Sequence, residues 1–242
     1  MTPVHNTVAL CLGLVATVIG LFVYSVLRTS VASADQLRDM GVFILPQARE
    51  IAPFELTLHT GAVFDLDSLE NRWSFLFFGF TNCPDLCPTA LAAMVQAERR
   101  LLELDAHPAA RLQSVFVSVD PERDHTDQLA AYVGAFSPNL LGATGSVAAL
   151  AALAAQLHVA FAKVPAANAV ATAGPNAVVE PAGEAVAKPP GEPIGEPTGA
   201  YQVDHSANIV IVNPKGHYHG FIKFPQQADT IVATFQSLAA NF

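Results

Sequence analysis

The sequence predicts an α/β protein in which strands and helices alternate along the chain. Short apolar segments rich in β-branched and aromatic residues recur, and segments with helical periodicity separate several of them. The predicted strands are 54–58, 62–66, 73–80, 112–119, 140–143, 159–164, 207–212 and 217–224, and the predicted helices are 89–104, 126–133, 147–158 and 228–238. Because the chain ends with a hairpin and a closing helix, we expect one sheet that is covered on both faces.

The clearest predicted strand is 73–80, where Phe75-Leu76-Phe77-Phe78 forms a continuous apolar run. Such a run is typical of a strand that is buried on both faces. The helix that follows extends to about Leu104 and combines a charged face with an aliphatic stripe. The next strand, 112–119, ends at Asp120-Pro121, because proline cannot donate a hydrogen bond to a sheet.

Two cysteines lie between the buried strand and its helix, in the run Cys83-Pro84-Asp85-Leu86-Cys87-Pro88. Residues four apart share one helix face, so both sulfurs can reach a single atom. The free N–H groups and the dipole of a helix start are expected to favour thiolate over thiol. A motif that opens the helix after a central strand fits a thioredoxin-like fold. Cu(I), Zn(II), a reversible disulfide and a structural disulfide are all compatible with this spacing.

The N-terminal part of the chain contains 20 residues without a charge, 8–27. As a helix this segment would span roughly 30 Å, about the thickness of a bilayer core. We therefore predict a transmembrane anchor at 8–27, preceded by a short tail at 1–7 and followed by a tether at 28–41 and the folded domain at 42–242. The alternative is a signal peptide cleaved after Ala34, although the apolar run exceeds the usual length of about 7–15 residues. Either interpretation exports the domain.

The segment 165–200 differs in composition from the rest of the domain. It contains seven prolines and is otherwise mostly Ala, Gly, Val and Glu, with no sustained period. Such a segment cannot bury enough apolar surface to offset the entropy of ordering it. We expect a disordered insertion within one domain, because the last strands are needed to complete the sheet.

Charge and cysteine content exclude several classes of protein. The formal net charge is −9 and no basic cluster is present, which argues against binding of nucleic acid. Only two of the three cysteines lie outside the apolar N-terminal segment, too few for a framework of structural disulfides.

Two further residues are candidates for the same site as the cysteines. Asp120 follows the strand 112–119, and His205 lies in Tyr201-Gln202-Val203-Asp204-His205-Ser206, directly before the C-terminal hairpin. Functional groups of α/β sheets gather at the carboxyl ends of strands. The alternatives are a turn residue before Pro121 for Asp120 and a packed histidine at a strand start for His205.

Three segments, in order, resemble the signatures of the Sco/SenC family of membrane-anchored copper-binding proteins. They are Phe78–Thr89, Val117–Asp124 and Val203–Ser206, and the similarity covers about 43–242 apart from the Pro-rich segment. The resemblance implies a thioredoxin-like domain that holds one copper ion, Cu(I) or Cu(II), per chain. The implied ligands are Cys83, Cys87 and His205, and an auxiliary role for Asp120 is a further expectation.

The resemblance also implies a function and a location. The expected function is that of a metallochaperone, without catalytic turnover, that delivers copper to the dinuclear copper site of cytochrome c oxidase subunit II. The alternative is a tethered thiol–disulfide oxidoreductase whose redox-active pair, Cys83 and Cys87, keeps the cysteines of that site reduced. In both cases we expect a single-pass protein of the cytoplasmic membrane with its domain on the periplasmic or outer side. Other periplasmic copper carriers are further expected partners.

Two features depart from the family pattern. Many members carry histidine before the first cysteine, where this chain has Asn82, so one auxiliary imidazole is missing. The Pro-rich segment is longer than expected and directly precedes the segment of His205. His205 is therefore expected to act as a conditional ligand, at a cost in affinity for ordering its approach.

Overall fold

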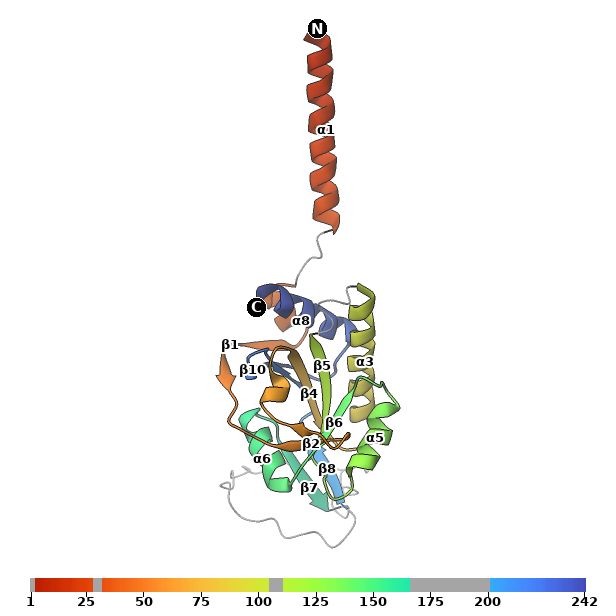
Figure 1. Ribbon diagram of the computed structural model, residues 1–242, viewed down its shortest axis with the longest axis vertical. Helices are drawn as coiled ribbons and strands as arrows, with labels where there is room; N and C mark the ends of the chain where they lie inside the picture. The colour runs from red at the N-terminus through yellow and green to blue at the C-terminus, as the bar shows by residue number, and fades with distance from the viewer. Residues whose placement is uncertain (1–2, 28–31, 105–110, 166–200) are drawn as a thin grey trace, which may run out of the picture.

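An eight-stranded mixed sheet organises the chain in the computed structural model, which describes residues 3–27, 32–104, 111–165 and 201–242 (Figure 1). The strand order is β1-β10-β9-β4-β5-β6-β2-β3. The strands are β1 (Val42–Glu50), β2 (Leu56–Leu58), β3 (Val63–Phe64), β4 (Trp73–Gly79), β5 (Leu112–Ser118), β6 (Leu141–Thr144), β9 (Ile209–Val212) and β10 (His217–Ile222). A separate two-stranded sheet pairs β7 (Phe161–Pro165) with β8 (Tyr201–His205).

Helices cover both faces of the large sheet, as predicted (Figure 1). They are α1 (Pro3–Leu27), α2 (Ala34–Asp39), α3 (Leu86–Leu104), α5 (Thr126–Gly134), α6 (Val147–Gln156) and α8 (Ala228–Asn241), with a short 3₁₀ helix, η1 (Asp67–Leu69). Side chains of α3, α5 and α8 pack in one hydrophobic cluster, and side chains of α6 pack in a second one. The predicted α/β architecture is therefore confirmed.

The strand β4 lies between β9 and β5 in the middle of the sheet, and every one of its residues is therefore buried. It runs parallel to β5, with Leu76 opposite Val115, and antiparallel to β9, with Phe77 opposite Ile209. Successive side chains of a strand point to opposite faces. Phe75 and Phe77 accordingly join the cluster of α3, α5 and α8, whereas Leu76 and Phe78 join the cluster of α6.

Two strands are absent from the predicted elements. The nine-residue β1 pairs only with β10 and contains Pro46, which an edge strand tolerates. Its apolar run, Val42–Leu45, is short, and Pro46 and the polar residues that follow hide the strand pattern. The second is β8, where the polar residues of the His205 segment adopt a strand because β7 pairs with them.

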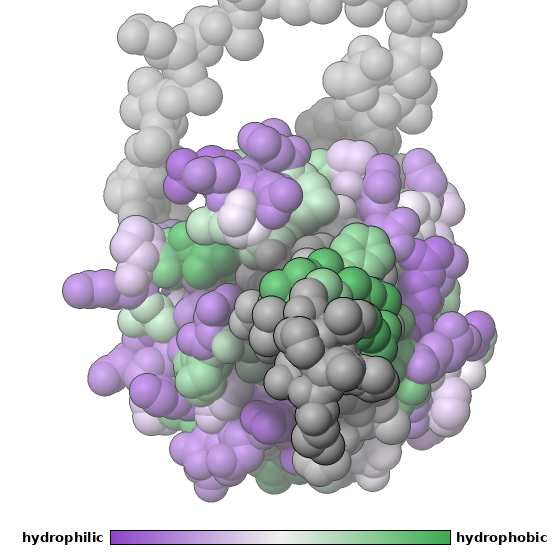
Figure 2. Space-filling view, turned by 90° about the horizontal axis from the view of Figure 1, so that it is seen from above, coloured by the Kyte–Doolittle hydropathy of each residue, from purple (hydrophilic) through white to green (hydrophobic). Residues whose placement is uncertain are grey.

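The predicted helix near the N-terminus is present as α1. The apolar side chains that are described in this helix, within 8–22, are largely exposed, and Figure 2, which looks down the helix, shows hydrophobic residues there beside a mostly hydrophilic surface. The exposed residues are Val8, Leu12, Leu14, Val15, Val18, Ile19, Leu21 and Phe22. The transmembrane prediction for 8–27 needs correction, because no helix in the described residues is both long enough and apolar enough to span a bilayer.

The predicted Pro-rich insertion, 165–200, lies outside the described residues except for Pro165, the last residue of β7.

Candidate metal centre

The two cysteines lie where β4 passes into α3. Cys83 is in the turn after Phe80, whose carbonyl oxygen accepts a hydrogen bond of 3.2 Å from the Cys83 N–H group. Cys87 lies in the first turn of α3, and its own N–H group donates to the Cys83 sulfur at 3.5 Å. Cys83 is half-buried and Cys87 is fully buried, so only one of the two sulfurs is accessible from solvent.

Gly79, the last residue of β4, provides the space for the buried sulfur. A Cβ atom at this position would lie 2.6 Å from Cys87 Sγ and 2.9 Å from Phe116 Cε2. Both distances are far below van der Waals contact. The absence of a side chain at Gly79 therefore allows α3 to bring Cys87 against the sheet.

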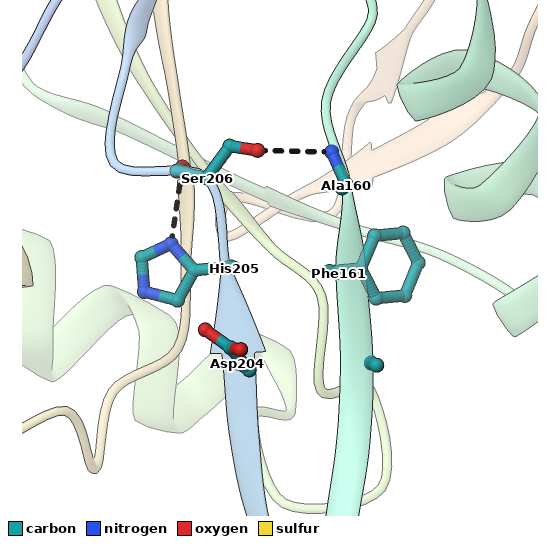
Figure 3. Close-up of a pocket in the computed structure, with 6 residues that line it drawn as sticks. Ala160, Phe161, Asp204, His205 and Ser206 are labelled. Carbon is teal, nitrogen blue, oxygen red and sulfur yellow. Dashed lines mark hydrogen bonds between the residues drawn. The ribbon is translucent and has the colours of Figure 1, made fainter. Parts of the chain in front are cut away.

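His205 reaches the cysteines from β8. Its Nε2 atom lies 3.5 Å from Cys87 Sγ. Its Nδ1 atom lies 3.2 Å from the carbonyl oxygen of Ser206, as the dashed line in Figure 3 shows. Because a carbonyl can only accept, the proton is assigned to Nδ1, and the lone pair of Nε2 faces the sulfurs. The rings of Phe77 and Phe80 stand nearly perpendicular to the imidazole, with centroids 5.9 and 5.8 Å away, and hold its plane.

The structure brings Cys83, Cys87 and His205 together. Their ligand atoms all lie within 4.8 Å of one another, and no other such group is found among the described residues. Two sulfurs and one imidazole nitrogen form a soft donor set, which suits Cu(I) and also Zn(II). The residues therefore fit a single copper ion, although their role as copper ligands stays a prediction.

Burial raises the pKa of the Cys87 thiol well above its usual value. A hydrogen bond with the backbone of Phe80 opposes this effect, and the nearby Cys83 adds to it. The prediction that the helix start favours thiolate is thus wrong for Cys87, because loss of hydration outweighs the helix terminus. Cys87 is a thiol at neutral pH, and metal binding must displace its proton.

Burial also lowers the pKa of His205, while its hydrogen bond to Ser206 and the charge of Asp204 act in the opposite direction. The imidazole is therefore neutral at neutral pH. Neutral imidazole is the form that binds metals, so His205 needs no proton loss before it acts as a ligand.

Asp120 is buried but does not belong to the converging group. Its carboxylate forms an ion pair with Arg123, three residues further along the same loop. The Arg123 guanidinium in turn lies over the Phe80 ring, 5.9 Å from its centroid. The structure therefore gives Asp120 a partner in the loop, and its auxiliary role at the metal stays a prediction.

Asp124 is the residue near the site that sequence reasoning missed. Its buried carboxylate accepts hydrogen bonds from the Thr81 N–H group at 2.8 Å, the Thr81 hydroxyl at 2.6 Å and the Ser118 hydroxyl at 2.6 Å. Thr81 lies two residues before Cys83, so Asp124 holds the turn that carries this cysteine. Its position in the segment 117–124, which resembles a family signature, could have marked it as a candidate. Nothing in the sequence, however, shows that its carboxylate binds Thr81.

Replacing Asp124 with asparagine is expected to lower the free energy of unfolding by about 1–3 kcal/mol. An amide offers one acceptor oxygen where three donors converge, so buried donors of Thr81 or Ser118 lose their partners. Urea denaturation measures the change. Asp127→Asn, at an exposed position of α5, is the matched control, and equal losses in the two variants would contradict this role of Asp124.

A pocket of 290 Å³ opens beside His205 (Figure 3). It is lined by residues of β7, β8 and their ends, namely Ala160, Phe161, Ala162, Asp204, His205 and Ser206. Since the half-buried Cys83 and the pocket flank the same site, a partner can approach it from solvent.

Comparisons with known proteins identify relatives of this chain. A family model described as SCO1/SenC matches residues 44–191. A protein of Stutzerimonas stutzeri that is named for copper binding is 32% identical over 206 residues, covering 85% of this chain and 84% of that protein. The mitochondrial SCO2 homologue of Mus musculus is 32% identical over 190 residues, which cover 78% of this chain but only 62% of that protein.

A solved structure has the same thioredoxin-like fold. The crystal structure of ScoI from Arabidopsis thaliana with copper bound superimposes with a TM-score of 0.61 at 26% sequence identity. The match covers 79% of this chain and 98% of that one.

Proposed function

Because this chain belongs to the SCO1/SenC family, we propose that it is a copper metallochaperone that delivers copper to the dinuclear copper site of cytochrome c oxidase subunit II. One observation carries the proposal: Cys83 Sγ, Cys87 Sγ and a nitrogen of His205 lie within 4.8 Å of one another. Soft thiolates favour Cu(I), and the imidazole supplies the nitrogen ligand that Cu(II) prefers.

The number of ligands supports copper over structural zinc. Structural zinc sites are almost always closed by four protein ligands, whereas the converging group within the described ranges has three. An incompletely saturated site suits a protein that must release its metal. The ligand set leaves room for a ligand from an acceptor protein.

The accessibility of the ligands supports transfer by ligand exchange. Cys83 is half-buried and His205 lines the pocket, whereas Cys87 is fully buried. An incoming cysteine of the acceptor would replace the accessible ligands first, and Cys87 would release the metal last. The proton that Cys87 takes up afterwards favours release, because burial stabilises its thiol form.

A second candidate function is thiol–disulfide exchange with the cysteines of subunit II. The observation that favours it is the close pair of free cysteines, one accessible and one buried. An accessible attacking sulfur with a neighbouring resolving sulfur is the arrangement that exchange requires. In this function His205 would be dispensable.

We place either activity on the outer, periplasmic side of the cytoplasmic membrane, where copper carriers would be further partners. The uncharged apolar segment at 8–27 supports export of the domain.

Transfer between purified proteins tests the proposal. Equal amounts of the protein loaded with one equivalent of Cu(I) and of the protein loaded with one equivalent of Cu(II) are mixed under anaerobic conditions with the reduced, copper-free domain of subunit II, so that two loaded molecules supply the two ions of each dinuclear centre. We expect copper to move to the acceptor and its dinuclear centre to appear in the visible spectrum, and we expect His205→Ala to deliver less copper. Retention of copper by the loaded protein would overturn the proposal.

A second arm separates the two functions. The copper-free, reduced protein is mixed with the oxidised acceptor, and free thiols on the acceptor are counted. Reduction of the acceptor that survives His205→Ala, without any copper transfer in the first arm, would support the oxidoreductase instead.

A further inference from the structure

The ligands of the proposed copper site come from two separate parts of the fold. Cys83 and Cys87 belong to the β4–α3 connection of the large sheet, whereas His205 belongs to the two-stranded sheet of β7 and β8. These two strands lie side by side at the end of the domain opposite α8 (Figure 1). The distance between sulfur and imidazole therefore depends on what holds this small sheet against the body.

The inner face of the small sheet is defined by its register. Phe161 pairs with His205, and Lys163 pairs with Val203. Alternate residues of a strand share one face, so these four side chains point to the same side. Val203 is only 6% exposed and packs in the core, which identifies this side as the one that faces the body.

Lys163 makes an ionic contact across this interface. Its Nζ atom lies 2.5 Å from Oε1 of Glu122, in the loop that follows β5. The side chain of Lys163 is 18% exposed and that of Glu122 is 50% exposed. The contact joins residues 41 positions apart in the chain. It therefore ties the strand that pairs with the His205 strand to the loop 120–124.

The same loop also holds the cysteine side of the site. Asp124 accepts the hydrogen bonds of Thr81, two residues before Cys83. Arg123 lies over the ring of Phe80, and that ring contacts His205 edge-on. One short loop thus contacts both the turn of the cysteines and the sheet of the histidine.

We propose that Glu122 and Lys163 are positioning residues that hold His205 within reach of the two sulfurs. This inference rests on the proposed function, since it takes His205 as a copper ligand. The ion pair acts through the small sheet and does not touch the metal ligands. It affects Cu(II), which needs the imidazole, and leaves Cu(I) to the thiolates.

Variants of the full chain test this inference. Glu122→Gln and Lys163→Gln are each expected to weaken Cu(II) binding about fivefold and to leave Cu(I) binding unchanged, since a half-exposed pair contributes modestly. Weaker Cu(II) binding alone raises the midpoint potential of bound copper, by about 40 mV for a fivefold change. The double variant Glu122→Lys with Lys163→Glu is expected to restore affinity and potential, because it rebuilds the pair with reversed charges.

Controls keep the outcome interpretable. Lys223→Gln removes an exposed lysine outside the small sheet and should change neither quantity. In 1 M salt the difference in Cu(II) affinity between the wild type and the single variants should shrink, because the Debye length falls to about 3 Å and the ion pair is screened. Urea denaturation of the copper-free proteins shows whether the fold itself is altered.

Two results would overturn the inference. One is wild-type Cu(II) affinity and potential in both single variants. The other is an equal loss of Cu(I) and Cu(II) binding that charge reversal does not rescue. Failure of the proposed function is a different result, namely retention of copper by the loaded wild-type protein in the transfer experiment.

Discussion

Replacing Cys83 or Cys87 with serine is expected to weaken Cu(I) binding by on the order of a thousandfold, because a soft thiolate ligand becomes a hard hydroxyl. The remaining sulfur and His205 cannot compensate, since the three ligand atoms form the only converging group in the part of the chain that the structure describes. Anaerobic competition with a chromogenic Cu(I) chelator measures the affinity.

The two cysteine variants should differ in stability. Cys87 is fully buried among apolar side chains, so its serine variant also buries a hydroxyl group. Cys83 is half-buried, and its serine variant should retain more of the free energy of unfolding. Cys11→Ser, on the exposed surface of α1, is the control and should change neither quantity. Wild-type Cu(I) affinity in either Cys83→Ser or Cys87→Ser would rule out the proposed site.

Gly79→Ala is expected to damage both the fold and the site. The new Cβ would lie 2.6 Å from Cys87 Sγ and 2.9 Å from a ring carbon of Phe116, so α3 or the aromatic ring must move. Overpacking of this kind costs about 1–3 kcal/mol in a well-packed core. Because the displaced atom is a ligand, Cu(I) affinity should fall together with stability. Urea denaturation and chelator competition measure the two effects.

A second glycine provides the matched control for this variant. Gly134, at the end of α5, has no atom within 4 Å of its Cβ position. Gly134→Ala should therefore leave copper binding unchanged and stabilise the helix, by about 0.5–1 kcal/mol. If Gly79→Ala behaves like Gly134→Ala, the close approach of Cys87 to β4 does not determine the geometry of the site.

Much of the fold follows from local patterns. The continuous apolar run of 73–80 predicts the central strand, because a strand that is covered on both faces has no polar side. The motif places the pair where β4 passes into α3, but only Cys87 lies in the helix. Cys83 lies in the turn before it, so the expected sharing of one helix face is wrong, and the Cys87 N–H group contacts the Cys83 sulfur instead. The alternation of strands and helices predicts the covered sheet. The edge strand β1 was missed because Pro46 and the polar residues after it obscure the short apolar run at its start.

The site depends on contacts that no local pattern contains. Cys87 and His205 are 118 positions apart, and β8 is a strand because it pairs with β7. The protonation of Cys87 was predicted incorrectly because a helix terminus is visible in the sequence, whereas burial by packed neighbours is not. The partners of Asp124 and Glu122 likewise depend on where the loops meet.

The sequence by itself determined the class of fold, the buried central strand and the presence of a soft pair of sulfurs at a helix start, because these features depend on periodicity and spacing within one segment. Only the tertiary structure decided that an imidazole faces those sulfurs, that one thiol is kept protonated and that a single loop contacts both halves of the site. Distances and burial between remote segments arise from packing, and packing is a property of the whole chain.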